Sequence, residues 1–161
     1  MSTNGRIKLK RLGDQERFKF LGTFEKYGFK YQDRAKIHAV PTILLINVTT
    51  PDGDPLTDHL WLNLTKGFAS HNILHSGDVL SFYGRVKAYT KGYRGHRLNT
   101  PPHLETDYAI GRPTKVTLVK CANPAAHQKW PEENWQIVNL IYEMSASDYQ
   151  SRQIPKPYPE L

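Results

Sequence analysis

The chain has 161 residues and a mass of 18.5 kDa, which suits one domain with a single core rather than two domains. Aromatic residues make up 11% of the chain, a content too high for an unfolded protein. The longest apolar run, Ile43 to Ile46, is too short to span a membrane, and the polar segment Met1 to Arg11 lacks the apolar core of a secretion signal. Cys121 is the single cysteine, so no internal disulfide can form. A cytoplasmic location is therefore expected.

The charge is unevenly distributed along the chain. Lys and Arg outnumber Asp and Glu by 22 to 15, a net charge of +7, to which residues 1–40 contribute +6, residues 41–120 +3 and residues 121–161 −2. The segment Val79 to Leu104 holds five Lys or Arg residues, several aromatic residues and no acid. Cations interleaved with aromatic rings suit a polyanion with flat apolar faces, such as unpaired nucleic acid. A basic surface over core aromatics has the same composition.

Three early segments place their apolar side chains as strands do. Arg17 to Tyr31 is apolar at mostly every second position, with a slip at Leu21-Gly22 that indicates a bulge. Thr42 to Thr49 is rich in Ile, Leu, Val and Thr and ends at a turn containing Pro and Gly. His59 to Leu64 puts three leucines on one face, which predicts that Trp61 points away from the core.

The middle of the chain contains two more predicted strands. Thr65 to Leu74 has near-helical spacing and predicts a short helix capped by its first residue. Val79 to Tyr89 alternates again, and Thr114 to Lys120 predicts a last strand. Between these strands, Lys91 to Asp107 is rich in Gly, Pro and polar residues and predicts a long loop. The alternation predicts these core residues: Phe18, Phe20, Phe24, Leu60, Leu62, Phe82 and Val86.

The C-terminal part changes character. Pro131-Glu132-Glu133 is a helix-start signature, and the apolar residues that follow predict an amphipathic helix to about Met144. This helix suits docking onto the sheet of its own chain or an oligomer contact. Ser145 to Leu161 contains three prolines and no periodicity, so a disordered tail is expected.

Five strands with a helix between the third and the fourth is the order of the OB-fold, a small Greek-key barrel that binds oligonucleotides. The stretch Ser76 to Tyr89, followed by Lys91-Gly92-Tyr93 and by Arg112 to Val116, resembles the OB-fold single-stranded DNA-binding proteins, particularly divergent members from phages and mobile elements. The resemblance covers residues 17–120. It implies a mainly β protein, with a five-stranded OB-fold barrel, that coats and protects single-stranded DNA with little sequence preference during replication, recombination or transfer.

This interpretation divides the chain into four parts. They are a basic N-terminal arm at residues 1–16, the OB-fold domain at 17–120, a helical extension at 121–144 and the disordered tail at 145–161. The chain does not end in the acidic, hydrophobic tip through which bacterial replication single-strand binders recruit partners.

The candidate nucleic-acid-binding residues combine cations for the phosphates with rings that stack on bases. In the first inter-strand loop they are Lys26, Tyr27, Phe29, Lys30, Tyr31, Arg34 and Lys36. On the outward strand faces they are Trp61, Tyr83, Arg85, Lys87 and Tyr89. In the long loop they are Lys91, Tyr93, Arg94 and Arg97.

Each group has a structural alternative. Tyr27 and Phe29 also suit core positions in a long bent strand, Trp61 suits a position under the C-terminal helix, and the loop cations suit a solvated edge. Arg85 and Lys87 are excluded from the core by alternation. The same residues also fit an OB-fold RNA-binding protein, or a protein–protein adapter that presents a basic face to an acidic partner.

Catalytic and metal-binding patterns are weak. His71 and His75 could share a helix face, but no Glu completes a His-Glu-x-x-His arrangement with them, and the chain has only one cysteine. Asp52, Asp54 and Asp58 fit a solvated turn better than a calcium loop, which needs a terminal glutamate. The chain has no Gly-rich phosphate loop. No enzyme activity, cofactor or metal is therefore expected.

Overall fold

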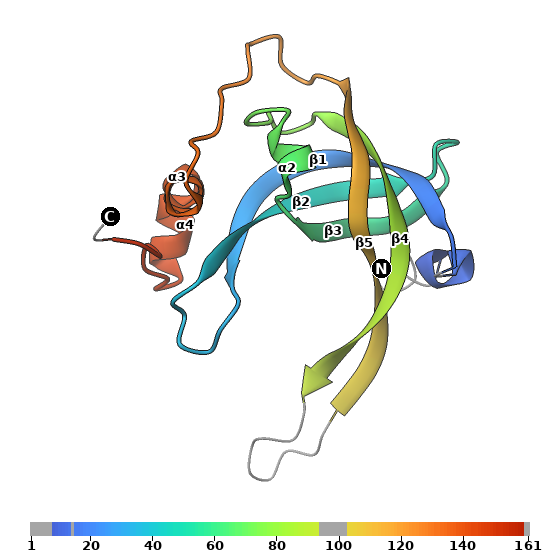
Figure 1. Ribbon diagram of the computed structural model, residues 1–161, viewed down its shortest axis with the longest axis horizontal. Helices are drawn as coiled ribbons and strands as arrows, with labels where there is room; N and C mark the ends of the chain where they lie inside the picture. Colours follow the sequence, from blue (N-terminus) through green and yellow to red (C-terminus); the bar gives the residue numbers. More distant parts are fainter. Residues whose placement is uncertain (1–7, 14, 94–102, 160–161) are drawn as a thin grey trace.

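The computed structural model describes residues 8–13, 15–93 and 103–159, with the backbone alone at residues 90–93 and 103–107. The protein is mainly β, with one sheet and a few short helices (Figure 1). The strands are β1 (Arg17–Tyr31), β2 (Ala39–Thr49), β3 (Pro55–Asn63), β4 (Val79–Tyr93) and β5 (His103–Lys120). The helices are α2 (Lys66–Ala69), α3 (Asn134–Met144) and α4 (Ala146–Ser151), and residues 8–12 are also helical.

The five strands form one antiparallel sheet in the order β3-β2-β1-β4-β5. The bulge predicted near Leu21 is confirmed, because the register of β1 against β2 shifts between Leu21 and Thr23. Among the described residues no ladder joins β3 to β5, so the sheet is open. A five-stranded antiparallel sheet is thereby confirmed, whereas closure into a barrel is not.

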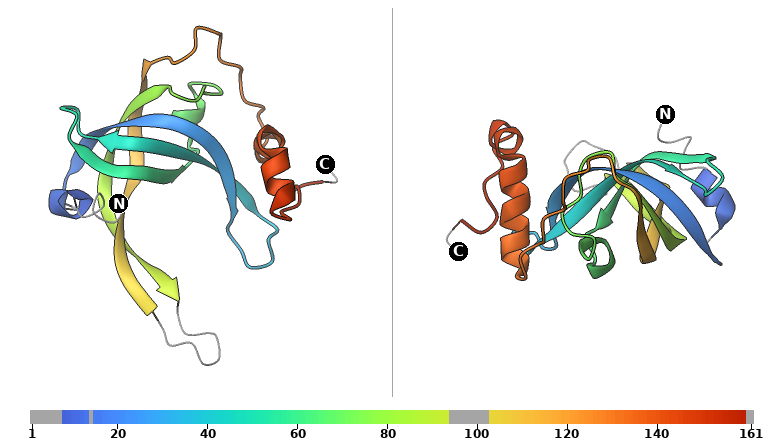
Figure 2. Two further views of the ribbon diagram at one scale, coloured as in Figure 1. Left: turned by 180° about the vertical axis from the view of Figure 1, so that it is seen from behind. Right: turned by 90° about the horizontal axis from the view of Figure 1, so that it is seen from above.

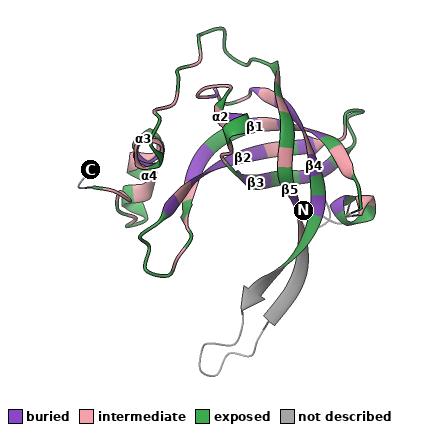
Figure 3. Ribbon diagram, in the orientation of Figure 1, coloured by how far each residue is buried: buried purple, intermediate pink, exposed green. Residues whose placement is uncertain are grey.

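Alternation decides which side chains enter the core. Six of the seven predicted core residues are buried, and Phe18 packs against them partly buried. Trp61 lies between the buried Leu60 and Leu62 and is 45% exposed, as its position on the opposite face predicts. Buried residues follow the centre of the sheet (Figure 3).

The short helix or helical turn predicted within Thr65 to Leu74 is confirmed as a single short helix. α2 covers only Lys66–Ala69. Thr65 occupies its N-cap position, but the threonine side chain makes no capping hydrogen bond. One apolar residue of this helix, Phe68, is fully buried and packs edge-on against Phe82 of β4.

The prediction that Lys91 to Asp107 forms a loop is wrong for both ends of this segment. β4 continues to Tyr93 and β5 begins at His103, and the two strands pair without interruption from Lys87 and Ala109 outward. Beyond Arg85, β4 pairs only with β5, so the two strands leave the sheet as a two-stranded arm (Figure 1). Sequence alternation reveals a strand where one of its faces is buried, and Lys91 to Asp107 shows no such alternation, so the sequence pattern does not predict this pairing. Residues 94–102 lie outside the described part of the chain.

α3 begins and ends as predicted. The backbone N–H of Glu133 donates to Oε1 of Gln136 at 3.2 Å, which caps the helix start. Val138, Ile141 and Tyr142 are buried where α3 packs on β1 and β2. The apolar face of the helix is therefore used within the chain, at one end of the sheet, while the helical residues 8–12 lie at the other end (Figure 2).

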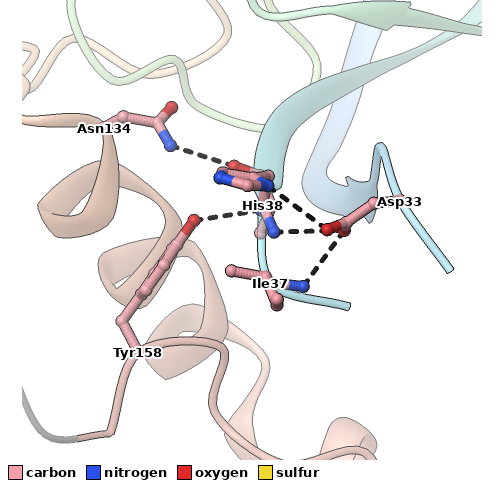
Figure 4. Close-up of polar contacts among 6 residues, drawn as sticks. Asp33, Ile37, His38, Asn134 and Tyr158 are labelled. Carbon is pink, nitrogen blue, oxygen red and sulfur yellow. Dashed lines mark hydrogen bonds and ion pairs between the residues drawn. The ribbon is translucent and has the colours of Figure 1, made fainter. Parts of the chain in front are cut away.

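The expectation of a disordered tail is wrong for residues 145–159, and residues 160–161 lie outside the described part of the chain. α4 follows α3 directly, and the hydroxyl of Tyr158 accepts the backbone N–H of Ala39 at 3.0 Å. The carbonyl of Ala39 accepts a hydrogen bond from Nδ2 of Asn134 at 2.9 Å, so the C-terminal part holds both polar groups of the first β2 residue (Figure 4). These long-range bonds supply the order that local periodicity does not predict.

Asp33 organises the loop that joins β1 to β2. Its Oδ1 accepts the backbone N–H groups of Ile37 and His38 at 3.0 and 3.2 Å, and its Oδ2 lies 3.2 Å from Nδ1 of His38 (Figure 4). Desolvation alone would raise the pKa of Asp33, but the hydrogen bonds from His38 and Ile37 outweigh it and lower the pKa.

Asp78 joins the turn before β4 to the segment after β5. Its carboxylate is fully buried and accepts the backbone N–H groups of His75 and Ala122 at 2.9 and 2.8 Å. Nε2 of His127 lies 2.8 Å from Oδ2 of the same carboxylate. Burial by itself raises the pKa of Asp78, but the hydrogen bonds from Ala122, His75 and His127 outweigh it and lower the pKa.

The N-terminal arm is partly built into the fold, because Leu9 is fully buried in the core. Among the described residues no helix is both long and apolar enough to cross a membrane.

Candidate functional site

Two adjoining cavities meet at Trp61. The first has a volume of about 470 Å³ and lies among β1, β3 and the C-terminal residues around α4. The second has a volume of about 450 Å³ and lies between β3 and β5. Lys30, Trp61, Leu62 and Asn63 line both cavities, so we refer to the pair as the Trp61 groove. Residues of the β1–β2 hairpin and of the β4–β5 arm line this groove, and Figure 1 shows where the hairpin and the arm lie relative to the sheet.

The indole of Trp61 reaches across β2 to the backbone of β1. A Cβ atom added at Gly28 would lie 3.0 Å from both Cη2 and Cζ3 of the indole and 3.1 Å from Oγ1 of Thr42. Any side chain at position 28 would therefore push against the indole, and glycine allows the approach without displacing it. The ring is thereby supported from below while 45% of the residue surface stays exposed, which suits stacking against a planar ligand.

The lining of the groove is strongly cationic. Six Lys or Arg residues contribute to it and one acid does. The cations are Lys26, Lys30, Lys36, Lys87, Arg112 and Arg152. The acid, Asp148, lies 3.3 Å from Nη1 of Arg152, one turn away on the C-terminal helix. The other five cations form no ion pair within the described part of the chain, so they are available to an anionic ligand.

An aromatic cluster forms the wall of the groove next to α4. The ring of Phe29 lies 5.8 Å from Tyr31 and 5.1 Å from Tyr149, and Tyr149 stacks on Tyr142 at 5.0 Å. Burial raises the pKa of Tyr31, with a contribution from Tyr158, and burial also raises the pKa of Tyr149. Both phenols therefore keep their protons at neutral pH and can donate hydrogen bonds to phosphate oxygens.

β5 is bent where it borders the groove. Arg112 and Lys115 adopt left-handed backbone conformations with φ of 52° each. The guanidinium of Arg17, at the start of β1, donates to the carbonyls of Tyr83 and Arg112 and, at 3.0 Å, to Oγ1 of Thr114. Arg17 therefore fastens the bend of β5 to the neighbouring strands and fixes where Arg112 enters the groove.

The groove unites half of the predicted binding residues. Those that line it, apart from the buried Tyr27, are Lys26, Phe29, Lys30, Tyr31, Lys36, Trp61, Lys87 and Tyr89. Lys87 also packs across β5, since a Cβ at Gly111 would lie 3.1 Å from its Cδ atom. The cations from the β1–β2 hairpin and from the β4–β5 arm thus face each other across Trp61.

Tyr27 is a core residue rather than a stacking residue. It is 5% exposed, its ring packs against Phe24 and Trp130, and its hydroxyl accepts the N–H of Leu74 at 2.9 Å. Burial raises its pKa far above the ordinary tyrosine value. Its ring is therefore unavailable to a ligand.

Other predicted residues lie away from the groove. Arg34 and Arg85 are exposed but do not line it, and half-buried Tyr83 lies under the ammonium group of Lys115, 5.3 Å from the ring centre. Tyr83 and Arg85 precede the arm, where β4 still pairs with β1 and its register against β5 shifts. The side chains of Lys91 and Tyr93, and the residues Arg94 and Arg97, lie outside the described part of the structure.

Sequence reasoning missed Arg112, Tyr149, Arg152 and Asn63 as lining residues. Asn63 could have been predicted from the sequence pattern, because Asn63 shares the outward face of β3 with Trp61. Tyr149 and Arg152 belong to the segment expected to be disordered, so no local signal pointed to them. Comparison with protein-family models, with curated proteins and with solved structures found no significant match to this chain.

Proposed function

We propose that the protein binds single-stranded DNA in the Trp61 groove, with little sequence preference, and thereby coats and protects the strand during replication, recombination or DNA transfer. The observation that carries the proposal is the lining of the groove, in which six cations and one already paired acid surround the exposed face of Trp61. Unpaired nucleic acid needs both features, because its phosphates require cations and its bases require rings.

The arrangement of the strands supports an OB-fold as the scaffold. In OB-folds, oligonucleotides contact the face of the second and third strands and the loops that follow the first and fourth strands. The Trp61 groove is bordered by β3, by the β1–β2 hairpin and by the β4–β5 arm. We propose that the sheet is a partly open version of this barrel, with the ligand along the opening between β3 and β5.

Non-specific coating fits the types of side chain present. Trp61 offers an exposed π-face, and every base has such a face, so stacking of about 1–3 kcal/mol per base carries little sequence preference. Flexible lysines contact phosphates as point charges and read no sequence. The steep salt dependence of such contacts provides a test.

The test is a titration of labelled single-stranded DNA, single-stranded RNA and duplex DNA of about 30 nucleotides at two salt concentrations, with tryptophan fluorescence followed in parallel. Tightest binding to single-stranded DNA, weakened by salt, is the expected result. Quenching should disappear in Trp61→Ala and persist in Trp135→Phe, since Trp135 does not line the groove.

The other outcomes redirect the proposal. Equal or tighter binding of RNA would favour the RNA-binding alternative. Absence of binding to all three ligands at low salt would overturn the nucleic-acid function and leave an acidic protein partner as the ligand of the basic groove.

A further inference from the structure

A second cluster of side chains lies outside the Trp61 groove. His75 and Asp78 come from the turn before β4, and His127 comes from the segment between β5 and α3. One donor atom from each residue can be chosen so that all three lie within 4.8 Å of one another. Separate stretches of the chain thus place two imidazoles and one carboxylate together.

The carboxylate is held in a fixed position. Asp78 is fully buried and accepts the backbone N–H groups of His75 and Ala122, while Nε2 of His127 lies 2.8 Å from its Oδ2. The side chain of His127 is 13% exposed, so two of the three members are largely shielded from water. The two backbone N–H groups are partners of the kind that orient ligating carboxylates in metal sites.

The hydrogen-bonded pair of Asp78 and His127 does not explain the surroundings of His75. Its Nδ1 is buried and has no hydrogen-bond partner within the described structure. Its ring stacks on that of His127 with centroids 4.4 Å apart, which fixes the ring beside the carboxylate. Buried polar atoms normally have partners, and a bound cation would supply one.

We propose that His75, Asp78 and His127 bind one divalent transition-metal ion of the zinc class. Zn²⁺ accepts imidazole nitrogens at about 2.0–2.1 Å and carboxylate oxygens at about 2.0–2.2 Å, and sites with three protein ligands keep a fourth position for water. The donor atoms lie within 4.8 Å of one another, so binding of one ion requires side-chain rotations that bring them to these distances. Imidazole ligands favour zinc over magnesium or calcium.

Metal binding here would fasten the segment between β5 and α3 to the turn that precedes β4. That segment leads to α3 and α4, and α4 forms one wall of the Trp61 groove. The bound ion would therefore stabilise the fold, since it binds the native arrangement of three ligands and not the unfolded chain.

The test uses the full chain with any affinity tag removed, stripped with a chelator and titrated with Zn²⁺, Co²⁺ and Mg²⁺. We expect one Zn²⁺ per chain, visible absorption bands from Co²⁺ of low coordination number, a higher Tm with Zn²⁺ and no comparable binding of Mg²⁺. His75→Phe keeps an aromatic ring for stacking but removes the ligand nitrogen. Loss of a supporting partner alone weakens metal sites by about 10- to 100-fold, so loss of a ligand should cost at least about 100-fold in Zn²⁺ affinity.

His38→Ala is the matched control, because His38 also pairs with an aspartate, Asp33, but has no second histidine beside it. This variant should bind Zn²⁺ as the unmodified chain does. Failure of the unmodified chain to bind Zn²⁺ or Co²⁺ would overturn the proposal, and so would unchanged Zn²⁺ affinity in His75→Phe. Zn²⁺ affinity and Tm are measured without nucleic acid, so their outcome does not depend on the function proposed for the groove.

Discussion

The indole of Trp61 lies so close to Gly28 that a Cβ at position 28 would stand 3.0 Å from two ring carbons. The position of the proposed stacking ring on β3 therefore depends on the absence of a side chain on β1.

Gly28→Val should displace the indole without removing any side chain that lines the groove, because the lining residue Gly28 has none. A stacked base contributes about 1–3 kcal/mol, so we expect roughly tenfold weaker binding of single-stranded DNA. Fluorescence titration measures the loss, and near-UV circular dichroism reports the movement of the ring. The double variant Gly28→Val, Trp61→Ala should bind no more weakly than Trp61→Ala alone. Fully additive losses would mean that Gly28 acts on some other part of the groove.

The position of the cations matters more than their number. The double variant Lys30→Gln, Lys87→Gln removes one cation from each side of the groove, whereas Lys120→Gln, Lys129→Gln removes two exposed cations elsewhere. Each lost phosphate contact should reduce the slope of log affinity against log salt by about 0.7 for a single strand. We therefore expect the slope to fall by about 1.4 in the groove variant and to stay nearly constant in the control. Equal changes in both variants would show that net charge alone drives binding.

Alternation predicted the faces of the strands but not their arrangement into the groove. Arg85 and Lys87 share the outward face of β4 in the sequence pattern, yet only Lys87 lines the groove. Between them β4 leaves its pairing with β1 and continues as a ribbon with β5. Two-stranded ribbons twist strongly, and this twist turns the same face in a new direction. Periodicity carries no information on where such a change occurs.

The core could be predicted because burial imposes a local period. The C-terminal wall of the groove could not, since it depends on contacts between residues far apart in sequence. Tyr158 bonds to Ala39 across 119 positions, and α4 contributes its side chains to the groove only after α3 has docked. The burial of Tyr27 could not be predicted for the same reason. Its ring packs against Trp130 and its hydroxyl accepts the N–H of Leu74, and both partners lie outside the strand that contains Tyr27.

Gly84→Ala should destabilise the fold at the base of the arm. The added Cβ would collide with Cγ2 of Ile110, a buried residue on β5. Overpacking of this kind costs about 1–3 kcal/mol, and each kcal/mol lowers Tm by about 2–4 °C in a chain of this size. Thermal unfolding measures the loss. Because Ile110→Ala removes the colliding atom, the double variant should be more stable than the sum of the two single losses predicts.

Asp33→Asn tests whether the charge of the Asp33 carboxylate stabilises the β1–β2 loop, because that charge depends on pH. The folded pKa of Asp33 is lowered, so its stabilisation of the loop is complete above its unfolded pKa of about 3.9 and is lost as the pH falls through the folded value. Amide exchange at Ile37 and His38 should be faster in Asp33→Asn than in the unmodified chain at neutral pH. That difference should shrink below about pH 4. A difference that persisted unchanged at low pH would show that the carboxylate charge does not hold the loop.

Tyr158→Phe removes one hydroxyl from the C-terminal segment that follows α4. Its loss leaves the buried N–H of Ala39 without the 3.0 Å partner it has now. A buried donor without a partner costs about 1–3 kcal/mol, which thermal unfolding can measure. Tyr149→Phe is the matched control, because the hydroxyl of Tyr149 forms no hydrogen bond among the described residues. If the two variants are equally stable, the C-terminal segment does not depend on the Tyr158 bond. A clear loss confined to Tyr158→Phe shows that this bond holds the segment, and with it the α4 wall of the groove, in place.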